Sequence, residues 1–113
     1  MTTKLTLKEM TVEHFVPCKG STLTFLRPAD GQGRREPVQL DLLAVTSYPQ
    51  AAVGGLRTPF SLIFRSVGGE TLGRGLHTLE HDAFEPSDIF LSRILVPVEY
   101  MREGGVFYEA VFA

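Results

Sequence analysis

The sequence predicts an all-β fold, a small six-stranded antiparallel barrel or sandwich with one short N-terminal helix. Apolar residues recur at every second position in three segments, which is typical of strands with one buried face. They are Phe60, Leu62 and Phe64, then Ile94, Val96 and Val98, and then Val106, Tyr108, Ala110 and Phe112. Turn residues separate such segments at roughly 8–12-residue spacing, as in small barrels and sandwiches. The eight Phe and three Tyr favour pleated, half-buried surfaces.

Composition indicates one globular domain over residues 1–113. A chain of this length buries roughly two thirds of its unfolded surface, and 43% apolar with 21% charged residues argues against disorder. The net charge of −2 argues against nucleic acid as the main partner. The adjacent pair Arg34 and Arg35, in a Gly-rich loop, is either a solvated loop tip or a phosphate site.

The sequence predicts a cytoplasmic protein. Cys18 is the only cysteine, so no disulfide forms within the chain, as expected in a reducing compartment. The N-terminal residues lack the apolar core of a signal peptide. No apolar run approaches the ~20 residues that span a bilayer. A non-classical export route is left open, because it has no signature of this kind.

The N-terminal helix is predicted over residues 12–15, with Thr11 as its N-cap. The Glu and His that follow do not form the Ser/Thr-x-x-Glu/Gln capping box. Pro17 and Gly20 end the helix, because proline cannot continue it and glycine suits its C-terminus. Three apolar side chains are expected to pack this segment over one end of the sheet: Leu7, Met10 and Phe15.

The first two strands are predicted over residues 21–27 and 38–46. The loop between them, residues 28–37, contains the strongest turn chemistry in the chain and suits a hairpin. In the second strand the apolar pattern changes phase between Leu42 and Leu43. A bulge, or a bend from one sheet to another, would produce that change.

The later strands are predicted over residues 59–66, 75–81, 89–100 and 106–112. The third of these contains Pro97, which should lie at an edge or a bulge because proline cannot donate to the ladder. Turns are expected at residues 67–70 and 82–88. The connection at residues 47–58 is long for a compact domain, and such loops often form contact surfaces.

His77, Glu80 and His81 match H-x-x-E-H, a zinc-protease pattern. That chemistry requires both histidines on one helical face, one turn apart. In a strand, His77 and His81 would share a face but lie about 13 Å apart, with Glu80 on the opposite face. We therefore expect two half-buried imidazoles that bond to neighbouring strands.

Two other clusters suggest chemistry. Cys18 near His14 resembles a thiol with an adjacent base, but a free cysteine is more often a small apolar residue. Asp82, Glu85 and Asp88 could bind a hard cation through oxygen, or form a solvated turn. The sequence assigns no catalytic residue, cofactor or metal ligand; if a site exists, its candidates are His77, Glu80, His81, His14 and Cys18.

Several segments together resemble a family of uncharacterised bacterial all-β domains of roughly 100 residues. They are Pro59-Phe-Ser-Leu-Ile-Phe-Arg65, Leu79-Glu-His81, Ile89-Phe-Leu91, Val96-Pro-Val98 and Tyr108-Glu-Ala-Val-Phe112. The resemblance implies an association with phage-tail-collar-like proteins and transfers no functional residue. The chain departs from the family pattern at residues 84–88 and 92–94, which leaves the register of the fifth strand open.

The leading functional hypothesis is a non-enzymatic protein-interaction or assembly module, an accessory of a phage-tail-like or surface apparatus. Strand edges or the loop at 47–58 would provide its contact surface. The alternative is a small-molecule- or metal-binding barrel, or an enzyme, that uses His77 and His81 with Glu80 or Cys18. A homo-oligomer formed by strand edges is a third interpretation.

Overall fold

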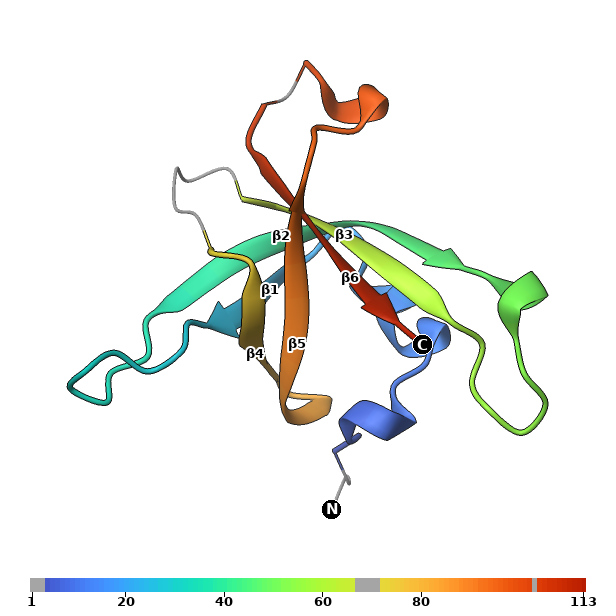
Figure 1. Cartoon of the computed structure of the whole chain (residues 1–113). Coiled ribbons are helices and arrows are strands. Elements are labelled where there is room, and N and C mark those ends of the chain that lie inside the picture. The colour runs from blue at the N-terminus through green and yellow to red at the C-terminus, as the bar shows by residue number, and fades with distance from the viewer. Residues whose placement is uncertain (1–3, 67–71, 103) are drawn as a thin grey trace.

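Six antiparallel strands close into a barrel in the computed structural model, which describes residues 4–66, 72–102 and 104–113 (Figure 1). The strands are β1 (Thr22–Leu26), β2 (Pro37–Ser47), β3 (Phe60–Ser66), β4 (Gly75–His81), β5 (Phe84–Ile94) and β6 (Val106–Phe112). Of the two architectures that the sequence predicts, the barrel is therefore the one that forms. The bounds of β4 and β6 are as predicted.

Two three-stranded meanders, β1–β2–β3 and β4–β5–β6, make up the barrel. β4 lies beside β1 and β6 lies beside β3, so the spatial order β4-β1-β2-β3 is that of a Greek key. The two meanders are joined unevenly. β3 and β6 pair along their whole length, whereas β1 and β4 pair over three residues. Within the second meander, β5 and β6 also pair over only three residues.

The barrel interior contains the alternate residues that the sequence pattern selects. In β6, Tyr108, Ala110 and Phe112 are buried in the core, while Val111 between them is exposed. The hydroxyl of Tyr108 accepts a hydrogen bond of 2.7 Å from the backbone N–H of Leu72, which leads into β4. The predicted turn at residues 67–70 lies outside the described residues.

Bulges adjust two strands. The register of β2 with β3 shifts between Leu42 and Ala44, which confirms the bulge predicted from the phase change. A second register shift lies between β4 and β5, where Leu79 pairs with Ser87 and His81 pairs with Phe84. Between these two pairs β5 contains one residue more than β4, next to Pro86. The predicted turn at 82–88 is therefore too long. The turn occupies residues 82 and 83, and β5 already begins at Phe84 because a bulge tolerates a proline without its N–H.

The predicted extent of the fifth strand is wrong at its C-terminal end too. β5 ends at Ile94, which pairs with Phe107 of β6. No described residue after Ile94 pairs with β6. Without a neighbouring strand the backbone leaves the sheet. Pro97 then lies outside the strand and caps η4 (Val98–Tyr100), a short 3-10 helix.

The N-terminal segment contains η1 (Leu7–Glu9), α1 (Val12–Phe15) and η2 (Val16–Cys18). The predicted helix and its N-cap Thr11 are confirmed. The expectation that no capping box forms is wrong. The N–H of Thr11 donates to Nδ1 of His14 at 3.0 Å, so an imidazole occupies the place of the usual carboxylate.

Phe15 closes one end of the barrel. Its ring is fully buried and stacks on Phe84 at 4.9 Å, with Phe60 at 5.7 Å and Phe112 at 5.6 Å between ring centroids. Met10 is buried in the same cluster, as expected. Leu7 is not; it remains partly exposed at the surface.

Candidate interaction surfaces

The two histidines of the H-x-x-E-H pattern make separate local contacts. His77 is 5% exposed, and its Nε2 donates to the backbone oxygen of Gly73 at 2.6 Å. Nδ1 of His77 is buried without a hydrogen-bond partner in the described structure. Nδ1 of His81 instead accepts from the N–H of Ala83 at 3.0 Å. Glu80 is exposed.

Within the described residues, no three His, Cys, Asp or Glu side chains form a group that could hold a metal ion. Asp88 accepts a hydrogen bond of 2.5 Å from the hydroxyl of Thr78. Asp82 lies in the β4–β5 turn and Glu85 lies near the bulge of β5. The three carboxylates therefore occupy distinct surroundings.

Cys18 is not arranged as an activated nucleophile. Its Sγ points to the backbone oxygen of His14 at 3.7 Å and not to the imidazole, whose Nδ1 already accepts from Thr11. Burial raises the pKa of the Cys18 thiol. A raised pKa reduces the thiolate, the form that attacks substrates.

The arginine pair is bound within its own loop and sheet. Nε of Arg34 lies 3.1 Å from the carboxylate of Asp30, and hydrogen bonds from backbone N–H groups, that of Arg34 first, lower the pKa of Asp30. Arg35 donates to the backbone oxygen of Arg27 at 3.0 Å and to the hydroxyl of Thr78. Both side chains thus serve to order the β1–β2 hairpin.

The most exposed apolar surface lies in the connection between β5 and β6. We call residues 95–102 the hairpin tip; it stands clear of the barrel body (Figure 1). Leu95 is 91% exposed and Val98 is 82% exposed, and Met101 beside them is also exposed. Single exposed aliphatic residues are ordinary, but a cluster on a projecting segment indicates a contact surface.

The hairpin tip is held in shape by its own packing. The ring of Tyr100 stacks on Phe107 with centroids 5.7 Å apart, and Phe107 is only 1% exposed. The N–H of Tyr100 donates to the backbone oxygen of Pro97 at 2.9 Å. Gly104 and Gly105 then return the chain with φ of 69° and 102°. A segment ordered in advance loses less entropy when it binds.

A second feature is a recess beneath the connection between β2 and β3, which we call the loop groove. It encloses about 540 Å³. Its walls come from the connection, from η1 and from the end of the chain: Lys8, Ala51, Val53, Gly55, Leu56, Arg57, Pro59 and Ala113. Most of these are apolar, and Val53 and Leu56 are strongly exposed. Ala51 is the residue of η3 (Pro49–Ala51) that lines it.

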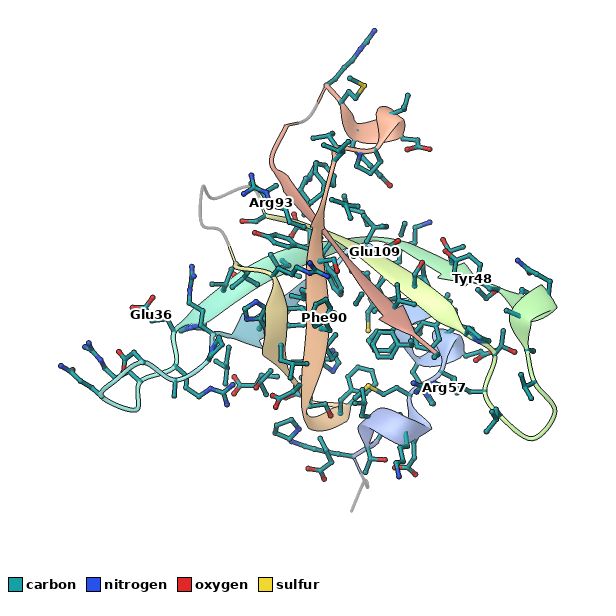
Figure 2. The ribbon with its side chains drawn as sticks, viewed as in Figure 1. Glu36, Tyr48, Arg57, Phe90, Arg93 and Glu109 are labelled. Atoms are coloured by element: carbon teal, nitrogen blue, oxygen red, sulfur yellow. The ribbon has the colours of Figure 1, made fainter. Side chains whose placement is uncertain are left out.

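Arg57 fixes the floor of the loop groove, at the end of the barrel where the N-terminal helices meet β6 (Figure 2). Its guanidinium donates to the backbone oxygens of Leu7 and Met10 at 2.8 Å each and of Ala113 at 2.9 Å. It also lies over the ring of Phe112, 5.5 Å from the centroid. This cation therefore ties three segments together.

Sequence reasoning placed one of these surfaces and missed the other. The loop groove is built largely by the 47–58 connection that was expected to form a contact surface. The hairpin tip was assigned to a strand. The sequence does contain an indication of this tip, the apolar run at 94–98. The run includes Pro97, and its residues after Ile94 have no partner strand in the described part of the chain.

The geometry defines a small closed β-barrel with clusters of exposed apolar groups on a projecting tip and along a surface groove. No described helix is both long and apolar enough to cross a membrane. Residues 10–112 match the model of DUF6916, a domain of unknown function, and the chain belongs to that family. Comparison with curated proteins and with solved structures found no match.

Proposed function

We propose that this domain is a non-enzymatic protein-interaction module that inserts its hairpin tip into an apolar recess of another protein chain. The observation that carries the proposal is the exposure of Leu95 and Val98 on a tip that is already ordered. A few side chains that become buried at the centre of an interface supply most of its binding energy.

The chemistry of the rest of the surface supports binding over catalysis. The ring nitrogens of His77 and His81 that make contacts bond to backbone groups nearby, and Cys18 is shielded from its imidazole neighbour. The rigid barrel provides a scaffold from which the tip projects, in the way that functional loops are usually displayed.

In its finer form, the proposal makes the domain an accessory of a phage-tail-like or surface apparatus. The resemblance to domains associated with phage-tail-collar-like proteins motivates this form. It predicts that the partner at the hairpin tip is a structural protein of such an assembly.

Site-specific photo-crosslinking in the native host tests both forms. A photoreactive residue replaces Val98, and the matched control carries it at Glu36, an exposed position on the β1–β2 hairpin. We expect one discrete crosslinked band from position 98 and none from position 36. Identification of a tail-like structural protein in this band by mass spectrometry would support the finer form, whereas any other single partner, a second copy of this chain included, would support the general form alone. Equal, diffuse crosslinking from both positions would refute the role of the tip.

A substitution provides the second measurement. Leu95→Asp should remove the crosslink from position 98 while leaving the circular dichroism spectrum and the unfolding midpoint unchanged, because the side chain is 91% exposed. If the crosslink survives this charge on the tip, apolar insertion is not the mode of binding.

A further inference from the structure

We infer that the loop groove of one copy receives the hairpin tip of a second copy, so that the domain assembles head to tail. The inference deepens the proposed function by naming a second copy of this chain as the partner. It rests on three observations: the shapes of the two surfaces, their charges, and their separate places on the barrel.

The first observation is a match of shape and polarity. The hairpin tip is convex and presents Leu95, Val98 and Met101 to solvent. The loop groove is concave, mostly apolar, and encloses about 540 Å³. Since a cavity of about 150 Å³ accommodates a benzene-sized group, the groove has room for about three aliphatic side chains.

The second observation is a match of charge. On the groove, Arg57 uses its guanidinium on backbone oxygens, so Lys8 is the lining cation available to a partner. On the hairpin tip, the exposed carboxylate of Glu99 lies directly beside Val98. An aliphatic anchor with an adjacent carboxylate suits an apolar recess with a lysine at its rim.

The third observation is the position of the two surfaces. The hairpin tip follows β5, whereas the residues that line the loop groove come from the β2–β3 connection, from η1 and from the end of the chain after β6. Figure 1 shows these segments at a distance from the tip. Because different surfaces meet, the contact is heterologous, and each added copy presents a new tip and a new groove. Such contacts form rings when the rotation closes and filaments when it does not.

Sedimentation equilibrium from about 10 µM to about 1 mM tests the assembly, since a contact of this small size is expected to be weak. We expect the average mass of the native chain to rise beyond that of a dimer. The tip variant Val98→Asp and the groove variant Leu56→Asp should each remain monomeric. Gln50→Asp, which adds the same charge outside the groove lining, should assemble like the native chain.

Mixing the two variants is the decisive measurement. The tip variant retains an intact groove and the groove variant retains an intact tip, so an equimolar mixture should form a 1:1 dimer and stop there. A monomeric mixture would overturn the inference, as would a monomeric native chain. A symmetric tip-to-tip dimer would also overturn it, and would show as loss of assembly in Val98→Asp but not in Leu56→Asp.

A charge exchange provides a second pair of variants that leaves the apolar surfaces intact. Glu99→Lys and Lys8→Glu should each weaken assembly, and the mixture of the two should restore it about tenfold or more relative to either alone; no restoration counts against the pairing. If the native chain stays monomeric while position 98 still crosslinks to a different protein, this inference fails and the proposed function stands.

Discussion

Phe15→Ala should destabilise the barrel more than any surface change, because this ring closes the barrel end. The side chain is fully buried and lies within 4.9–5.7 Å of three other aromatic rings. Truncation removes the apolar area and leaves a cavity that a short helix fills only in part.

The magnitude follows from the kind of site. Burial of a phenylalanine and the cavity it leaves together amount to about 3–5 kcal/mol, and we take about 4 kcal/mol because several ring pairs are lost at once. Domains of this size have unfolding free energies of about 5–15 kcal/mol. The variant should therefore fold but lie close to its threshold.

Urea denaturation followed by circular dichroism measures the loss. With an m-value of about 2 kcal/mol/M, the midpoint should fall by about 2 M. The control Val16→Ala changes the adjacent residue, which is 56% exposed, and should alter the unfolding free energy by less than about 0.5 kcal/mol. A loss below about 1 kcal/mol for Phe15→Ala would refute the closing role, since it falls outside the range for a filled core site.

Three further outcomes follow from the structure. Tyr108→Phe leaves the buried N–H of Leu72 unpaired and should lower the unfolding free energy by about 1–3 kcal/mol in urea; an unchanged value would contradict this hydrogen bond. Gly105→Ala should cost about 1–3 kcal/mol, because φ is 102° and the new Cβ would lie 2.9 Å from a backbone oxygen of β3. Gly104→Ala, at φ 69° in open space, should cost less, and equal losses would argue against the steric contact. The raised pKa of Cys18 predicts that native protein is alkylated with a half-maximal rate at higher pH than urea-unfolded protein. The raised pKa also stabilises the folded protein at pH values below the ordinary thiol pKa, and this stabilisation is lost as the pH rises through the folded-state pKa. A half-maximal alkylation rate at a lower pH in native than in unfolded protein would exclude the raised pKa.

Sequence reasoning succeeded where local pattern and final burial coincide. The alternation in β6 and the turn chemistry before β4 predict both strands with their observed bounds. The phase change at Leu42 predicts the bulge because a register shift moves every later side chain to the other face. These features depend on neighbours close in sequence or on one consistent pattern.

The failures have a common physical cause. The bulge beside Pro86 allows β5 to begin earlier than predicted. β5 also ends earlier than predicted, because its pairing with β6 stops at Phe107. Both limits of β5 therefore depend on the neighbouring strands β4 and β6. The conformational propensity of a single residue contains no information about such partner strands.

The sequence by itself determined the all-β class, the short helix and most of the inward-facing residues, because hydrophobic periodicity is a property of each segment alone. Only the tertiary structure decided that the strands close into a Greek-key barrel, that Phe15 fills its end, and that Arg57 joins three distant segments. It also decided which apolar residues are left without a partner. Val98 and Leu91 are both aliphatic residues in predicted strand five, but only Leu91 has a barrel interior to enter. Exposure is set by which segments meet, and for this protein the exposed segments are where its function is proposed to lie.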